Sequence, residues 1–185
     1  EARILYDDDA LYVGLWLYDS APDSIQSQLA RRDFSGQSDW AHVIIDSYHD
    51  RRTAFRFSIN PDGVMKDVLH SDDTNEDISW DAVWEAHTRR DDQGWTAEFR
   101  IPFSQLRFSS APEGGTWGLQ FLRQIARHNE RSWWSPMPAD MSGTVSLFGD
   151  LTGLVGLKPP RHVELLPYTL GKLGRLPGRK DDPFY

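Results

Sequence analysis

The sequence predicts an all-β protein, an antiparallel β-sandwich with a short C-terminal extension. Residues 79–108 alternate polar and apolar side chains through one long hairpin, and other strand-like segments recur at short intervals along the chain. Aromatic residues make up 12% of the 185 residues, with eight Trp. Aromatic side chains favour strands, and short strands separated by turn signals are typical of sandwiches rather than of βαβ units.

The hairpin of residues 79–108 has the clearest pattern. One face of its second strand is apolar and holds Trp95, Ala97, Phe99 and Ile101. Its polar turn, residues 89–94, ends in Gly94, because a hairpin loop favours glycine at its left-handed position. Pro102 cannot donate a ladder hydrogen bond, so it ends the strand, and residues 103–106 are predicted to form a short helical turn.

Further strands are predicted in chain order over residues 3–6, 11–18, 39–46, 53–60, 64–71, 116–128 and 148–154. Residues 11–18 are apolar on one face and aromatic on the other, which predicts a central strand covered on both faces. Residues 24–34 are polar and fit an edge strand, and residues 130–146 are predicted to be a long loop. Pro159-Pro160 marks a boundary, so the domains are residues 1–157 and a tail, residues 158–185, with one strand over residues 162–170.

Charge and composition exclude several classes of function. The net charge is −8, and residues 1–157 hold 14 Lys and Arg against 25 Asp and Glu. Phosphates would be repelled by this surface, so nucleic acid is not an expected partner. There is no cysteine, which excludes thiolate metal sites and cysteine nucleophiles. The sequence has no nucleophile elbow, phosphate loop or His-x-x-x-His motif, so we expect no enzyme activity.

Several motifs in order resemble a known family. They are LYDDDALYVGLWLYDS (residues 5–20), SDWAHVIIDSYHDRRTAFRFSINPDGV (38–64), the hairpin of 79–108 and SLFGDLTGL (146–154). Together they resemble a carbohydrate-binding family 9-like domain, of the type that precedes a bacterial outer-membrane β-barrel. ELLPYTLGKL (164–173) looks like the first strand of such a barrel.

The resemblance covers about residues 1–157 and implies a jelly-roll β-sandwich that binds carbohydrate without catalysis. It also implies a periplasmic or cell-surface location, the protein's own outer-membrane barrel as a partner, and structural calcium. Members of the family hold a sugar between two tryptophans. Matching the motifs places these clamp positions at about Gly36 and Ser142, neither of which carries a ring. The positions that read hydroxyl groups fall near His42, Ser58 and Asn60.

Candidate ligand-binding residues come in two sets. Tryptophan rings stack on the flat apolar faces of sugars, and the candidates for such a platform are Trp133, Trp134 and Trp80. Amide and guanidinium groups suit paired hydroxyls, and the polar row that could line a concave sheet face holds His42, Arg56, Ser58, Asn60 and Gln124. The alternatives are core packing for the rings and a solvated outer face for the polar row.

The acidic loop at residues 72–77 is the candidate metal site. Its oxygen ligands are Asp72, Asp73, Asn75 and Asp77, which are of the type that calcium prefers. The loop lacks the EF-hand pattern, and a solvated acidic loop is the alternative.

Three other functions remain open from sequence. The first is an interaction or plug module for the protein's own barrel that binds no sugar. The second is a glycoside hydrolase, which would need two facing carboxylates such as Glu85 and Glu98. The third is haem binding, which related sandwiches achieve between a Met and a His, and here would use His128 with a methionine, Met65, Met137 or Met141.

Overall fold

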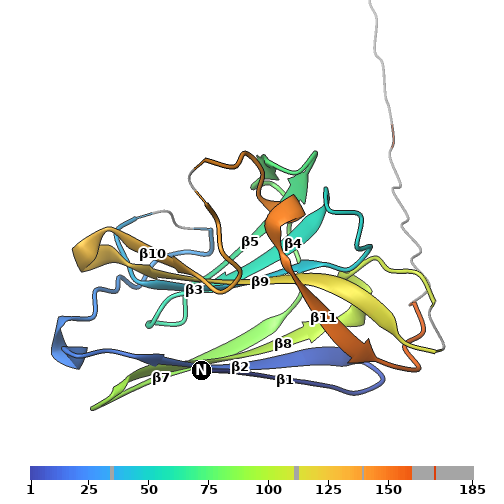
Figure 1. The fold of residues 1–185 in the computed structure, drawn as a ribbon. Coiled ribbons are helices and arrows are strands. Elements are labelled where there is room, and N and C mark those ends of the chain that lie inside the picture. Colours follow the sequence, from blue (N-terminus) through green and yellow to red (C-terminus); the bar gives the residue numbers. More distant parts are fainter. Residues whose placement is uncertain (34–35, 111–112, 139, 160–168, 170–185) are drawn as a thin grey trace, which may run out of the picture.

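The fold, seen in a computed structural model, is a sandwich of two antiparallel sheets (Figure 1). The structure describes residues 1–33, 36–110, 113–138, 140–159 and 169. The predicted all-β class is therefore confirmed. The strand predicted over residues 162–170 and nearly all of the tail lie outside the described residues.

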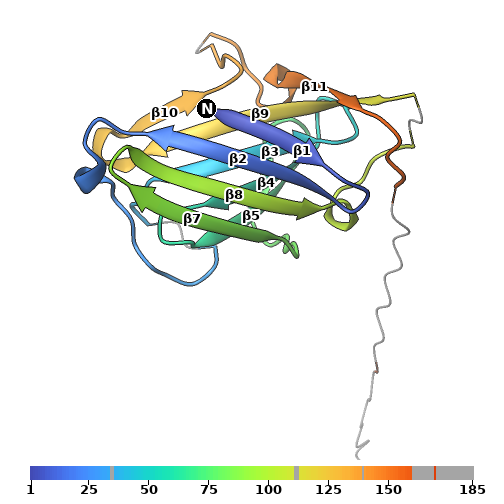
Figure 2. The ribbon, with the colours of Figure 1, turned by 90° about the horizontal axis from the view of Figure 1, so that it is seen from below.

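The smaller sheet has four strands in the order β1-β2-β8-β7 (Figure 2). Their bounds are β1 Ala2–Tyr6, β2 Ala10–Tyr18, β8 Gly94–Pro102 and β7 Glu85–Asp91. The β7–β8 hairpin closes with Asp91 opposite Gly94, so its loop is tighter than the predicted turn of residues 89–94. Gly94 has a φ of 144°, and a Cβ there would lie 2.2 Å from the carbonyl oxygen of Leu17, so the position requires glycine.

The larger sheet has seven strands, in the order β10-β9-β3-β4-β5-β6, with β11 also paired to β9. Their bounds are β3 Trp40–Asp46, β4 Ala54–Ile59, β5 Met65–Ser71, β6 Asn75–Asp77, β9 Gly115–Ile125, β10 Glu130–Trp133 and β11 Gly149–Leu154. Four short 3-10 helices occur at η1 Pro22–Ser24, η2 Phe103–Gln105, η3 Ala126–His128 and η4 Val145–Leu147. None of the helices among the described residues is long and apolar enough to cross a membrane.

The core lies between the two sheets and is built from the alternating positions that the sequence indicates. Its buried side chains include Leu11, Val13, Leu15, Leu17, Phe55, Phe57, Ile59, Trp95, Ala97, Phe99 and Ile101. Trp84 is also buried and stacks on Phe99, with ring centroids 5.8 Å apart. Each large apolar side chain buried in this way contributes about 1.5–3 kcal/mol to stability.

Three sequence predictions need correction. Residues 24–33 form no strand beyond the turn of η1, because the segment is held by side chains instead: Arg32 pairs with the buried Asp67 at 2.5 Å. The segment predicted as a loop over residues 130–146 begins with the edge strand β10. The strand β2 is central, but only one of its faces is covered, since Tyr18 is 53% exposed.

Candidate carbohydrate-binding site

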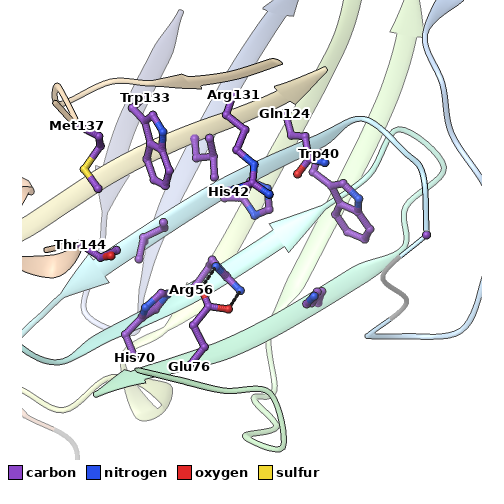
Figure 3. Close-up of a pocket in the computed structure, with 14 residues that line it drawn as sticks. Trp40, His42, Arg56, His70, Glu76, Gln124, Arg131, Trp133, Met137 and Thr144 are labelled. Carbon is purple, nitrogen blue, oxygen red and sulfur yellow. Dashed lines mark hydrogen bonds and ion pairs between the residues drawn. The ribbon is translucent and has the colours of Figure 1, made fainter. Parts of the chain in front are cut away.

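A cavity of about 430 Å³ opens on the outer face of the larger sheet, and Figure 3 shows its lining. Because strand residues alternate between faces, the positions between the core residues point into this cavity. The lining residues are Gly36, Trp40, His42, Ile44, Arg56, Lys66, His70, Glu76, Leu122, Gln124, Arg131, Trp133, Met137 and Thr144. The volume lies within the range of about 300–1,000 Å³ that is typical of ligand pockets.

The register of the strands brings these side chains together in rows. Arg131 on β10, Gln124 on β9 and Trp40 on β3 are successive cross-strand neighbours. In the next row Trp133 lies opposite Leu122, which lies opposite His42. Each row therefore collects residues that are more than 80 positions apart in the sequence, as the numbering of Trp40 and Gln124 illustrates.

Two loops wall the cavity, and buried polar residues fix both. Gln120 donates to the carbonyl of Ser135 at 2.9 Å and accepts from its amide at 2.8 Å, which holds the loop that carries Met137. On the other side Asn60 donates to the carbonyl of Gln28 and to Ser38 at 3.0 and 3.2 Å, which anchors the segment that leads to Trp40. Hydrogen bonds from the buried side chains of Gln120 and Asn60 therefore hold both walls in place.

His42 forms the floor of the cavity and is only 8% exposed. A hydrogen bond of 2.8 Å joins its Nδ1 to the hydroxyl of the buried Ser58 and so orients the ring. Its Nε2 is buried and has no partner among the described residues. Burial lowers the pKa of His42 well below its ordinary value, and the charges of Arg56 and Lys66 lower it further, so the ring is neutral.

His70 and Arg56 are also incompletely bonded. Both ring nitrogens of His70 are buried without a partner in the described part of the chain, and so is the Nε of Arg56. Burial, followed by the charge of Arg56, lowers the pKa of His70 to about 4. Arg56 forms two hydrogen bonds with Glu76, at 2.8 and 3.0 Å. Burial raises the pKa of Glu76, but these bonds and the Arg56 charge outweigh it, and the pKa is lowered.

Unpartnered buried polar groups cost free energy, about 1–3 kcal/mol for each group that loses its hydrogen bonds. Four such nitrogens, on His42, His70 and Arg56, surround this one cavity. A ligand with several hydroxyl or carboxyl oxygens would satisfy them. The cavity is therefore suited to a polar ligand that carries many oxygen atoms.

Two tryptophan rings rise on either side of His42 (Figure 3). Trp133 is partly exposed and packs at its base against the small apolar cluster of Ile44, Ala54, Val145 and Phe148. Trp40 is only 5% exposed and stacks against His42, with ring centroids 6.3 Å apart. Trp133 is thus the ring that is available for stacking, whereas Trp40 supports the floor.

The structure separates the three predicted platform tryptophans. Trp134 follows Trp133 on an extended chain, so its ring points to the opposite face, where it packs against Phe121 and lines a different groove of about 380 Å³. Trp80 packs against the core rings Phe55 and Phe57 at 5.2 and 5.9 Å and also lines another cavity. Neither Trp80 nor Trp134 lines the site.

Only some residues of the predicted polar row line the cavity. His42, Arg56 and Gln124 line the cavity, but Ser58 and Asn60 are fully buried beneath it and do not. Ser58 orients His42, and Asn60 is engaged in the Asn60–Val64 turn, where its Oδ1 accepts from the amide of Val64 at 2.8 Å. Both residues support the site without reaching into it.

Apart from Gly36, nine lining residues were not among the predicted sugar-binding residues: Trp40, Ile44, Lys66, His70, Glu76, Leu122, Arg131, Met137 and Thr144. The alternation of residues 65–71 contains a signal for two of them, because Lys66 and His70 take the positions between inward residues such as Met65 and Leu69. Arg131 and Trp133 are also two residues apart, which places their side chains on the same face of a strand. The matched clamp position at Gly36 does line the cavity, while Ser142 is exposed and its near neighbour Thr144 lines it.

The side chains of the acidic loop, the candidate calcium site, have separate partners in the structure. Asp72 pairs with Arg52 at 2.6 Å, and Asp77 accepts from Ser79 at 2.6 Å. Asp73 accepts from the amides of Thr144 and Ser146, each at 2.9 Å, so it holds the loop that carries Thr144. Asn75 pairs with Ser71 in the β5–β6 ladder. The three carboxylates thus have different partners, and no cluster of three or more His, Cys, Asp or Glu suited to a metal occurs in the part described, so calcium binding by this loop stays a prediction.

The structure does not bring together at the cavity the residue pairs considered for glycoside hydrolysis, Glu85 with Glu98, or for haem binding, His128 with a methionine. Glu85 lies opposite Arg100, whereas Glu98 lies opposite His87, and both carboxylates are exposed on the smaller sheet. Met65 packs against the core, and His128 is exposed and does not line the site.

Three solved structures resemble this fold. A family 9 carbohydrate-binding module from Caldicellulosiruptor kristjanssonii in complex with cellotriose is 21% identical, with 90% of this chain and 80% of that chain covered and a TM-score of 0.58. The chain has a family 9-like fold. The same kind of module in complex with glucose is 18% identical, with 90% and 79% covered and a TM-score of 0.52.

A "putative carbohydrate-binding protein" from Bacteroides uniformis is 12% identical, with 82% of this chain and 76% of that chain covered and a TM-score of 0.66. No protein-family model and no curated protein matches the chain. The comparisons therefore support the predicted fold.

Proposed function

We propose that the chain is a non-catalytic carbohydrate-binding domain and that it holds part of an oligosaccharide or polysaccharide in the cavity on the larger sheet. Trp133 supplies the ring that stacks on the sugar face. His42, His70, Arg56 and Gln124 bond its oxygen atoms. The family 9-like fold supports this proposal, because its solved neighbours hold cellotriose and glucose.

The observation that carries the proposal is the set of buried nitrogens with no partner, on His42, His70 and Arg56. A sandwich that only filled space would place apolar side chains at these positions, because unsatisfied polar groups cost stability. Sugar hydroxyl groups both donate and accept, so they suit a neutral imidazole whose nitrogens can take either role.

Catalysis is not part of the proposal. Glycoside hydrolysis needs two carboxylates about 5–9.5 Å apart across the bond that breaks. Glu76 is the one carboxylate among the described lining residues, and two hydrogen bonds from Arg56 occupy it. The site therefore has groups for holding a sugar and lacks the acid and base pair for cleaving it.

Isothermal titration calorimetry of the chain with a panel of oligosaccharides tests the proposal. Trp133→Ala is expected to weaken binding about 5- to 150-fold, since one stacked ring contributes about 1–3 kcal/mol. Trp134→Ala is the matched control, because it removes the neighbouring ring from the other face and should leave binding within about twofold. Absence of binding to every sugar, or equal losses in the two variants, would contradict the proposal.

We also propose a place at the cell surface or in the periplasm, attached to the protein's own outer-membrane barrel. The ordered motifs and the segment of residues 164–173 support this placement, and all of that segment except residue 169 lies outside the described residues. Recovery of the natural protein in the outer-membrane fraction of cells is the expected result, and recovery in the cytosol would contradict it.

A second candidate is a module that contacts its own barrel and binds no sugar. The groove lined by Trp16, Phe121 and Trp134 favours it, because exposed aromatic side chains often mark interaction surfaces. Under this candidate the wild-type chain binds no glycan, and Trp134→Ala, rather than Trp133→Ala, reduces retention of the barrel in a pull-down assay.

A further inference from the structure

The charged side chains of the cavity are mostly cationic, although the domain around them is acidic. Arg56, Lys66 and Arg131 line the site, with Glu76 as the one carboxylate among the described lining residues. By contrast, residues 1–157 carry 14 Lys and Arg against 25 Asp and Glu. The cavity thus has the opposite sign of charge to the rest of the domain.

The single carboxylate does not neutralise this charge. Glu76 is engaged by Arg56 through both of its oxygen atoms, so those two charges cancel each other. The guanidinium of Arg131 has no hydrogen bond or ion pair within the described residues, and the side chain extends from β10 in the direction of His42 (Figure 3). The positive charge of Arg131 therefore remains for a ligand to meet.

The positive charges of the cavity lower the pKa of neighbouring basic groups. Burial and then the Arg56 charge lower the pKa of Lys66, although the charges of Glu76 and Asp33 act in the opposite direction. Burial is also the main cause for His42, and Arg56, Lys66 and Arg131 each lower its pKa further. Cations held together in a partly buried site repel each other, and an anion that enters the site relieves that repulsion.

Hydrogen-bond donors also exceed acceptors in the cavity. The guanidinium and ammonium groups of Arg131, Arg56 and Lys66 can only donate. Acceptors are fewer: Glu76 is occupied, only Gln124 and Thr144 offer further side-chain oxygens, and each neutral imidazole, on His42 and His70, has one nitrogen that can accept. A carboxylate or sulfate accepts and does not donate, so it matches this lining better than a hydroxyl group does.

We infer that the cavity prefers an acidic sugar, one that carries a carboxylate or sulfate group, to a neutral one, with Arg131 bonding the anionic group. This inference rests on the proposed sugar-binding function and names the class of its ligand. Arg131 suits the role because its planar group can form two parallel hydrogen bonds with a carboxylate. Its exposed position allows it to turn toward the bound sugar.

Calorimetry with matched pairs of ligands tests the inference. Oligogalacturonates and glucuronate-bearing xylo-oligosaccharides are compared with their own methyl esters, beside a neutral cello-oligosaccharide and a sulfated galactan oligosaccharide. We expect at least one acid to bind about tenfold or more tightly than its neutral counterpart at about 50 mM salt, and the difference to shrink at about 500 mM. Tight binding by the uronates identifies a carboxylate, and tight binding by the galactan alone identifies a sulfate.

The variant Arg131→Gln should lose about tenfold in affinity for the acidic ligand and less than about twofold for the neutral one. Arg89→Gln is its control, because Arg89 is exposed on β7 of the other sheet and the substitution makes the same change in net charge. An equal effect of the two variants would mean that only the overall charge matters and would overturn the inference.

The results also separate this inference from the proposed function. If neutral sugars bind as tightly as acidic ones, the acidic preference is wrong and the sugar-binding function stands. If none of the acidic or neutral ligands binds, the proposed function itself is wrong.

Discussion

Replacement of His70 by glutamine is expected to make the free energy of unfolding less sensitive to acid. His70 is 1% exposed, and burial followed by the Arg56 charge lowers its pKa from 6.5 to about 4. The unfolded chain keeps the ordinary pKa of 6.5. Between the two values the unfolded chain binds more protons than the folded one, so stability falls as the pH falls through this range.

The size of the effect follows from the two pKa values. The neutral ring contributes its full share of stability above pH 6.5. Proton uptake by the unfolded chain removes about 2 kcal/mol of that share at pH 5 and about 3 kcal/mol at pH 4. The His70→Gln chain does not undergo this loss of stability. The carboxyl groups titrate in both chains, so they do not contribute to the difference between the two curves.

Urea unfolding followed by tryptophan fluorescence, at pH values from about 7 to about 4.5, measures this difference. The curve of free energy against pH should be flatter for His70→Gln than for the wild type. His87→Gln is the control, because His87 is exposed on β7, and its curve should follow the wild type. Parallel curves for His70→Gln and the wild type would refute the reasoning, since they would mean that His70 takes up protons equally in both states.

Two further predictions concern the walls of the cavity. Asn60→Ala should lower the free energy of unfolding by about 2–4 kcal/mol in urea unfolding, because it leaves the buried amide of Val64 without its partner; a loss below about 1 kcal/mol would contradict this. Asp73→Ala should lower Tm, by about 2–4 °C for each kcal/mol lost, because it releases the loop at Thr144 and Ser146. Calcium should leave the wild-type Tm unchanged, and a rise would show that the calcium prediction holds at this loop or elsewhere.

The sequence was sufficient to predict which residues form the core. Alternation of large apolar side chains fixes the buried face of a strand, so Phe55 and Phe57 could be placed inward without coordinates. The same alternation places Arg56 on the outer face. What it does not supply is the register between strands, which decides that Arg56 reaches Glu76 across the sheet.

The tryptophans illustrate the limit most clearly. Trp133 and Trp134 look alike in sequence, and only the pairing of β10 with β9 shows that the first ring faces the cavity. The four-residue strand β10 lacks an apolar alternation long enough to be recognised, so its residues were assigned to a loop. Trp80 was misplaced for a related reason, since its packing against Phe55 depends on a loop path that no local pattern encodes.

The core also fixes the positions of the cavity residues, because the same strands carry both sets of side chains. On β4, Phe57 packs between the sheets, while Arg56 lines the cavity on the other side and Ser58 lies buried beneath it, bonded to His42. A slip of one residue in β4 would bring Phe57 to the cavity and bury the Arg56 guanidinium in the core, where a charge without a partner costs several kcal/mol. The apolar residues therefore select the single register in which the cationic lining forms, and the charge of the cavity is as strongly determined as the core beneath it.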